Sequence, residues 1–118
     1  MKAGEADAFV SAGNTGACVA GAQIKLRLIP GVERPGIASA LPNEFGACHL
    51  LDAGANPDAK PSHLLGYAIM GSAFATGVMG VQRPKVGIMS NGEEDEKGTA
   101  FTKETFKLIK EFSETGRA

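Results

Sequence analysis

The sequence predicts an α/β fold with a largely parallel sheet. Short apolar runs bounded by turn residues alternate along the chain with segments whose apolar residues recur at helical spacing. This alternation is typical of parallel sheets, because a helix is the usual connection between two parallel strands. No internal repeat and no linker interrupts the pattern, so we expect a single domain over residues 1–118.

The first predicted elements are a short strand and a helix. The apolar run Ala8–Val10 ends at a turn over Ser11–Gly13, as a buried strand would. Apolar residues at helical spacing then predict a helix over Thr15–Leu28, which Pro30 terminates.

Two strands and a long helix are predicted next. Gly36–Leu41 is a candidate strand, and Cys48–Ala53 is a stronger one. Pro61 can open a helix that runs to about Met79.

The C-terminal part repeats the alternation. Val86–Met89 is predicted as a strand, Asn91–Gly98 as an acidic loop, and a last helix starts near Thr99. Apolar residues lie on one side of that helix, at Phe101, Leu108 and Phe112.

The segment Leu64–Val81 has no formal charge over eighteen residues, the length at which a membrane span is considered. Its glycines, serine and threonine weaken its hydropathy, which argues against a span. A helix that is apolar all round is usually buried in a larger core or at a subunit interface. Gly71 and Ala75, four residues apart, would let another backbone approach closely. We therefore predict a buried packing helix.

Composition excludes several classes of protein. A hydrophobic fraction of 43% and a charged fraction of 21% fit a globular chain long enough for about one core. A net charge of −1 without a run of Lys or Arg argues against nucleic acid as a partner. Cys18 and Cys48 lack metal-ligand spacing, and no apolar segment follows Met1, so we expect reduced thiols in a cytosolic protein.

The first candidate site is the turn Ser11–Gly16, between a predicted strand and a predicted helix. Its backbone N–H groups and the helix dipole favour an anion, and Ser11, Asn14 and Thr15 add side-chain donors. The alternative is simple helix capping, for which the same residue types are preferred. No Lys follows Gly16, so the turn is not a P-loop.

The second candidate site is the segment 52–61, which also follows a strand. Ligands of open α/β sheets bind beyond the carboxyl ends of the strands, so this segment and the first turn would converge there. Lys60 would neutralise a phosphate or a developing oxyanion. The alternative is a turn built from Asp, Asn, Gly and Pro, without a functional role. The polar residues concerned are Asp52, Asn56, Asp58 and Lys60.

Other polar residues give weaker signals. The acids of 93–96 are contiguous, whereas hard-cation loops place ligands at alternating positions, so no metal is predicted. His63 falls in the first turn of the long helix as a capping or site-lining residue, and His49 is expected to be a strand side chain. Ser11 has no base near it in the sequence, so a nucleophilic triad is not supported.

Five strings, taken together and in this order, resemble the PlsX-type phosphate acyltransferases of bacterial phospholipid synthesis. They span nearly the whole chain, at Asp7–Gly16, Ile29–Pro35, Leu50–Asn56, Lys60–Leu64 and Asn91–Gly98. Known members are nearly three times as long, so the resemblance implies a central piece of such a protein. Two departures are Ala59, where the family often has Cys, and Gly36, where a larger residue is usual.

The resemblance implies that inorganic phosphate attacks the thioester of an acyl-acyl carrier protein, giving acyl-phosphate without a cofactor. It also implies a three-layer α/β/α fold like that of phosphotransacetylases and isocitrate dehydrogenase-type proteins, a homodimer, and peripheral contact with the cytoplasmic membrane face. The alternatives are a phosphate acetyl- or butyryltransferase that uses coenzyme A, and a non-catalytic segment that dimerises or docks on the carrier protein.

With this resemblance, the expected site divides into two groups. Catalytic roles are expected for Lys60, Asn56 and Asp52. Contacts to phosphate or substrate are expected from Ser11, Gly13, Asn14, Thr15, Gly16, Asp58, His63, Glu93 and Lys97.

Overall fold

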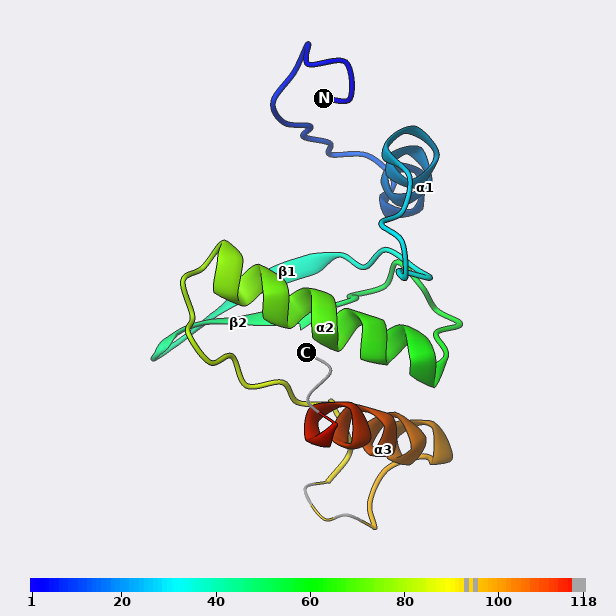
Figure 1. The fold of residues 1–118 in the computed structure, drawn as a ribbon, viewed down its shortest axis with the longest axis vertical. Coiled ribbons are helices and arrows are strands. Elements are labelled where there is room, and N and C mark those ends of the chain that lie inside the picture. The colour runs from blue at the N-terminus through cyan, green and yellow to red at the C-terminus, as the bar shows by residue number, and fades with distance from the viewer. Residues whose placement is uncertain (93, 95, 116–118) are drawn as a thin grey trace.

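The computed structural model describes residues 1–92, 94 and 96–115. It confirms an α/β chain, in which a hairpin of two strands is combined with helices (Figure 1). The elements in chain order are α1 (Thr15–Leu26), β1 (Ala38–Asn43), β2 (Gly46–Leu51), α2 (Pro61–Gly77) and α3 (Ala100–Glu114).

The sheet is antiparallel, so the prediction of a largely parallel sheet is wrong for the strands that the structure describes. β1 and β2 pair from Ala38 opposite Leu51 to Asn43 opposite Gly46. Only two residues connect them, which suits a hairpin, whereas parallel strands need a crossover of a dozen residues or more. At the turn, Asn43 Oδ1 accepts a hydrogen bond from the Phe45 N–H at 2.9 Å. Each of the two strands begins and ends about two residues away from the predicted bounds.

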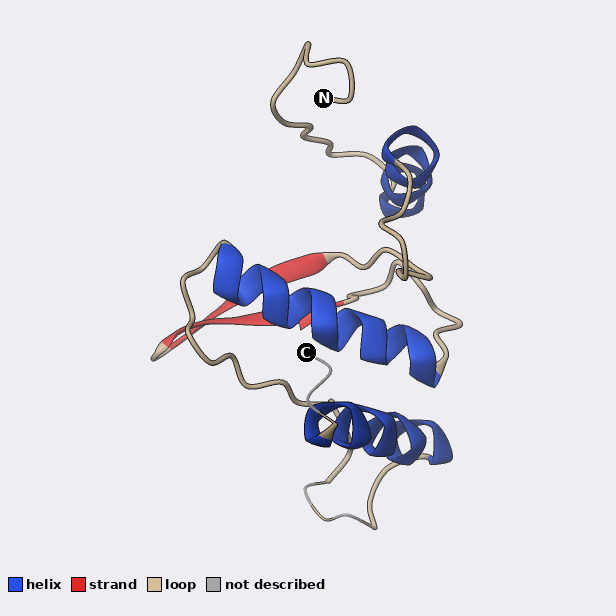
Figure 2. Ribbon diagram, viewed as in Figure 1, coloured by secondary structure: helices blue, strands red, loops and turns tan. Residues whose placement is uncertain are grey.

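Helix α2 lies across one face of the hairpin (Figure 2). The His49 ring of β2 meets the Phe74 ring of α2 edge-on, with centroids 5.6 Å apart. Farther along, Leu51 lies so close to Gly71 that an added Cβ would be 2.9 Å from Leu51 Cδ1. Gly71 therefore serves close packing within this chain, between α2 and the end of β2.

Helix α3 packs against α2 and lies below it in Figure 1, whereas the hairpin passes behind α2. It starts where predicted, because Thr99 Oγ1 accepts a hydrogen bond from the Thr102 N–H at 3.2 Å. Its inner face contains Thr105, which is fully buried and donates its hydroxyl to the Phe101 carbonyl at 2.8 Å. The three apolar residues predicted to share one side, Phe101, Leu108 and Phe112, are half-buried.

Two predicted strands are absent from the described chain. Ala8–Val10 has no strand beside it, and its Phe9 and Val10 are 69% and 94% exposed. Val86–Met89 likewise runs without a pairing strand, since the hairpin is the sheet formed by the described residues. A strand needs a neighbour for its backbone hydrogen bonds, and neither apolar run has one.

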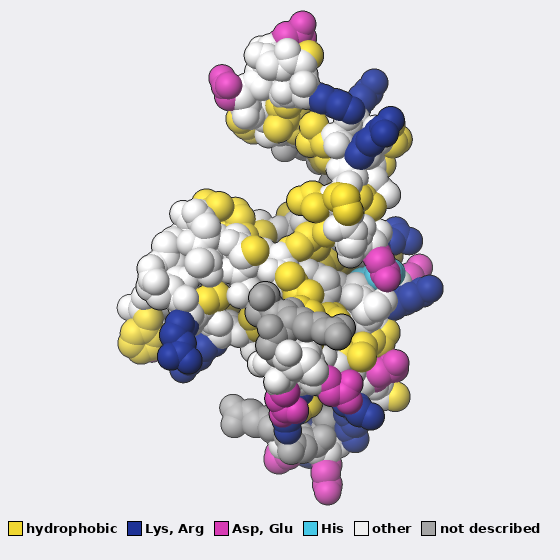
Figure 3. Space-filling model, viewed as in Figure 1, with side chains coloured by type: hydrophobic (Ala, Val, Ile, Leu, Met, Phe, Trp, Pro, Cys, Tyr) yellow, Lys and Arg dark blue, Asp and Glu magenta, His cyan; other side chains and the backbone are white. Residues whose placement is uncertain are grey.

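The hydrophobic core is smaller than a chain of this length can form. Tyr67 is the buried hydrophobic residue among those described, so the described residues form much less of a core than the length of the chain allows. The radius of gyration is 15.5 Å, against about 13.5 Å for a compact domain of this length. Figure 3 shows hydrophobic side chains exposed on the surface in several groups.

The helices reflect this small core. α1 has no buried residue and stands apart from the hairpin and α2 (Figure 1). Only His63 and Tyr67 are buried in α2, so the predicted buried helix packs on two sides and leaves a third face exposed. None of the helices in the described ranges is both long and apolar enough to cross a membrane.

The two α2 glycines Gly66 and Gly71 give a matched test of this packing. A Cβ at Gly66 meets nothing within 4 Å, so Gly66→Ala should raise the free energy of unfolding by about 0.5–1 kcal/mol through helix propensity. In Gly71→Ala the new methyl group must displace Leu51, which should cancel or reverse that gain. Chemical denaturation of both variants makes the comparison, and equal stabilisation by the two would contradict the packing of α2 on β2.

Candidate functional site at the N-terminal end of helix α2

Three segments meet beside the first turns of α2, and Asn56 joins two of them. Its side-chain Nδ2 donates to the Pro35 carbonyl at 3.1 Å and to Asp52 Oδ2 at 2.8 Å. The other carboxylate oxygen of Asp52 accepts from the Ala55 N–H at 3.2 Å. Both hydrogens of the Asn56 amide are thus committed, so its oxygen is the group left to meet a ligand.

His63 is held at both ring nitrogens. Its Nδ1 accepts a hydrogen bond from the Lys60 backbone N–H at 3.2 Å, so the ring proton is on Nε2. Nε2 lies 3.4 Å from Glu33 Oε2, which also accepts from the Ser62 hydroxyl at 3.3 Å. Glu33 therefore places a carboxylate at the N-terminal end of α2, where the helix dipole favours negative charge. This arrangement makes His63 a buried capping residue and leaves it no free nitrogen for proton transfer.

A small pocket of about 120 Å³ opens between these segments. It contains one cation and one anion, the side chains of Arg34 and Asp58, together with the Asn56 amide and the His63 ring. None of the described residues that line it is Ser, Thr or Cys, so this lining offers no hydroxyl or thiol nucleophile. The residues that line it are Arg34, Ala55, Asn56, Pro57, Asp58 and His63.

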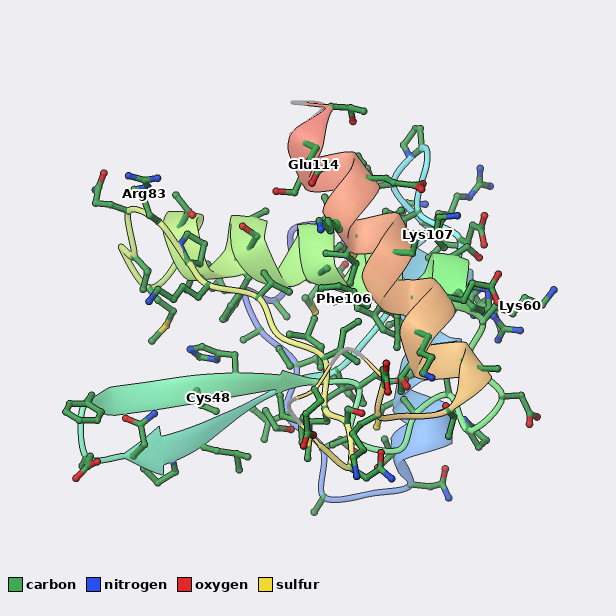
Figure 4. All side chains as sticks on the ribbon, turned by 90° about the horizontal axis from the view of Figure 1, so that it is seen from below. Cys48, Lys60, Arg83, Phe106, Lys107 and Glu114 are labelled. Atoms are coloured by element: carbon green, nitrogen blue, oxygen red, sulfur yellow. The ribbon has the colours of Figure 1, made fainter. Side chains whose placement is uncertain are left out.

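Lys60 precedes Pro61, the first residue of α2, and its side chain is exposed to solvent (Figure 4). Its backbone contributes to the site through the bond to His63, while its ammonium group is not part of the pocket wall. The structure thus brings together five of the expected residues around the start of α2: Asp52, Asn56, Asp58, Lys60 and His63.

Tyr67 lies one helical turn after His63 in α2. The residue is 4% exposed, and its hydroxyl has no hydrogen-bond partner among the described residues. Burial raises the pKa of the Tyr67 phenol above its ordinary value of 10.0, and the negative charge of Asp52 raises it further, against an opposing effect of Arg34. Asp52 and Arg34 are thus close enough for their charges to act on this hydroxyl. A side-chain hydrogen bond to Asp52 adds to the rise in pKa, although its geometry is too poor to satisfy the buried hydroxyl.

The turn Ser11–Gly16 lies elsewhere, at the start of α1 (Figure 1). Asn14 Oδ1 accepts from the Ala17 N–H at 3.1 Å, and Ser11 Oγ accepts from the Gly13 N–H at 3.0 Å. The capping interpretation therefore describes the bonds that this turn makes. The structure does not bring the turn together with the segment 52–61.

The third candidate loop gives less information. Glu93 lies outside the described residues, and the Lys97 N–H donates to the Glu94 carbonyl at 2.9 Å within a turn. No hydrogen bond or ion pair within the described ranges joins Lys97 to the α2 site. No group of three acidic, His or Cys side chains gathers as a metal site in the same ranges.

Sequence reasoning missed three residues of this site: Glu33, Arg34 and Tyr67. Glu33 and Arg34 stand in a string that carried the family resemblance, but no local pattern shows that this string folds back onto a loop twenty residues later. Tyr67 was treated as one apolar residue of a uniform helix. Its status as the single tyrosine of the chain was the available signal.

Comparison with known proteins identifies the family. Residues 1–116 match the family model described as fatty acid synthesis protein, and the chain belongs to that family. Its relatives include proteins named phosphate acyltransferase from Akkermansia muciniphila, 66% identical over 116 residues and 98% of this chain, and from Desulfitobacterium hafniense, 51% identical over 109 residues and 92% of this chain. A protein of the same name from Helicobacter hepaticus is 50% identical over 114 residues, or 96% of this chain.

The chain spans about a third of the length of these relatives, with 33%, 33% and 34% of their lengths covered. The phosphate acyltransferase family resemblance is thereby confirmed for this chain.

The Asn56 bridge is tested by Asn56→Asp. The substitution replaces two donated hydrogen bonds by a carboxylate facing Asp52 and the Pro35 carbonyl, which should cost about 1–3 kcal/mol of stability. It should also speed hydrogen exchange across 33–36. The control is Asn43→Asp, because an Asp oxygen can still accept from the Phe45 N–H. If Asn56→Asp were as stable as this control, the bridge would not hold the site together.

Proposed function

We propose that this chain is part of an enzyme that transfers an acyl group from acyl-acyl carrier protein to inorganic phosphate, giving acyl-phosphate for phospholipid synthesis. The names of the relatives support acyl transfer to phosphate. The observation in the structure that carries the proposal is the α2 pocket, whose described lining residues include an arginine but no Ser, Thr or Cys. Such a site suits a reaction in which phosphate itself is the nucleophile.

Arg34 is proposed to hold the phosphate. A guanidinium group matches the geometry of a phosphate, with two parallel donors for two oxygens. The Asn56 amide oxygen is the complementary acceptor, because a phosphate monoanion or dianion carries at least one O–H at neutral pH. Lys60, beside the pocket, supplies the second positive charge. Its exposed and flexible side chain can reach the phosphate or the thioester oxygen.

The reaction balances without an outside proton source. An oxygen of HPO₄²⁻ forms a bond to the thioester carbon, and the carbonyl oxygen becomes an oxyanion that Lys60 stabilises. Collapse breaks the carbon–sulfur bond and releases the carrier-protein thiolate, while the proton of HPO₄²⁻ passes to that sulfur. Asp58, the carboxylate of the pocket wall, is proposed to carry this proton from oxygen to sulfur. Asp52 positions Asn56 through their 2.8 Å hydrogen bond.

The first turn remains part of the proposal as a second anion site. Ser11, Gly13, Asn14, Thr15 and Gly16 are exposed, and the backbone N–H groups at the start of α1 favour negative charge. In the complete enzyme this turn would bind a phosphate-bearing part of the substrate. Glu93 and Lys97 are proposed to contact phosphate or substrate in the complete enzyme.

The complete protein is proposed to have a three-layer α/β/α fold, to form a homodimer, and to work in the cytoplasm with peripheral contact at the membrane. A dimer contact through Gly71 would compete with Leu51, which already covers that position. The free face of α2, at Ile69, Ala73 and Thr76, is the better candidate because all three residues are exposed.

Removal of the Lys60 charge tests the mechanism. Lys60→Met in the full-length protein should lower kcat/KM for acyl-phosphate formation about ten- to a hundredfold, the effect of losing one charge-assisted contact. Arg34→Gln should instead act mainly on the KM for phosphate. Lys103→Met removes an equally exposed charge from α3 and serves as the control.

Steady-state kinetics with acyl-acyl carrier protein and inorganic phosphate make this measurement. A loss below about twofold for both Lys60→Met and Arg34→Gln would remove the α2 pocket from the reaction.

A further inference from the structure

Tyr67 presents a polar group that the described structure does not satisfy. The hydroxyl of this residue is inaccessible to solvent and has no hydrogen-bond partner in the described ranges. Buried tyrosine hydroxyls usually have such a partner, because an unpaired donor is costly in a low-dielectric interior. The Tyr67 hydroxyl therefore needs an acceptor with good hydrogen-bond geometry.

The ring of Tyr67 has little freedom to seek a partner. A Cβ added at Gly36 would lie 3.0 Å from Tyr67 Cδ1 and 3.1 Å from Cε1, so the backbone of the 33–36 segment lies directly against the ring. One turn earlier on the same helix, His63 is tied to Lys60 and Glu33. Gly36 leaves room for the ring, and the ring in turn fixes where the hydroxyl lies. A partner must therefore reach the hydroxyl at that fixed position.

Asp52 is the acceptor that fits. Each of its carboxylate oxygens accepts one hydrogen bond, from Ala55 and from Asn56, and each has a second lone pair. Its charge already acts on the phenol, and it follows β2 at the point where Leu51 packs against α2. Arg34, the other charge that acts on the phenol, is a donor and cannot accept from it.

We propose that Tyr67 is a positioning residue, whose hydroxyl donates a hydrogen bond to the Asp52 carboxylate and holds the 52–56 turn against the 33–36 segment when substrate is bound. The proposal rests on the proposed function, since it assigns the substrate to the pocket beside Arg34 and Asn56. Tyr67 does not touch substrate and acts through Asp52 and Asn56.

The kinetic test is a double-mutant cycle in the full-length protein. Tyr67→Phe keeps the ring against Gly36 and removes only the oxygen, so the melting temperature should change little. We expect kcat/KM for acyl-phosphate formation to fall about five- to tenfold in this variant. In an Asp52→Asn background the same substitution should cost less than about twofold, because its acceptor is already changed. A purely structural role would give equal losses in both backgrounds and would overturn the proposal, as would wild-type kinetics for Tyr67→Phe.

A second measurement is independent of activity. The absorbance change on tyrosine ionisation, taken as the difference between the wild type and Tyr67→Phe, reports this phenol alone. It should ionise above pH 10.0 in the wild type. Asp52→Asn should lower the pKa of Tyr67, because it removes a negative charge that opposes ionisation. An unchanged Tyr67 pKa in Asp52→Asn would overturn the pairing. If Asp52→Asn lowers the pKa of Tyr67 but has wild-type kinetics, the contact between Tyr67 and Asp52 is supported and the proposed function is wrong.

Discussion

The hydrogen bonds of one amide group assemble the candidate site. Asn56 donates to the Pro35 carbonyl and to the Asp52 carboxylate, and so joins the segment that contains Arg34 to the turn that follows β2. An asparagine has two amide hydrogens, and here both are used within the chain. Glu33 and Gly36 add further contacts between that segment and α2, through Ser62, His63 and Tyr67.

Helix α2 provides the rigid base for that bridge. Its N-terminal end is occupied by the Glu33 carboxylate and the His63 ring, which satisfy the helix dipole and the Lys60 N–H. The middle of α2 contacts the end of β2 where Gly71 meets Leu51. This contact fixes the position of Leu51 and therefore of Asp52, the next residue. The helix meets the hairpin on one side and α3 on another, which accounts for its apolar residues on those two sides.

Sequence patterns predicted the helices well and the sheet poorly. Helical starts at Thr15, Pro61 and Thr99 depend on local capping chemistry, which the sequence displays directly. The pairing of strands depends on contacts between distant residues, so the hairpin of β1 and β2 was not anticipated. The same division holds for the site. The residues of 52–63 were selected from a local pattern, whereas Arg34 and Glu33 reach them only through the folded chain, and Tyr67 acquires its role from Gly36 and Asp52.

The most direct test is hydrogen–deuterium exchange of the full-length protein with and without saturating inorganic phosphate. Inorganic phosphate has two candidate sites in this chain. One is the α2 pocket bordered by 33–36 and 52–60, and the other is the turn at 11–16. If phosphate binds beside Arg34 and Asn56, exchange should slow in peptides that cover 33–36 and 52–60, and this slowing should disappear in Arg34→Gln. Slowing confined to peptides that cover 11–16 would contradict the account and assign the phosphate to the start of α1.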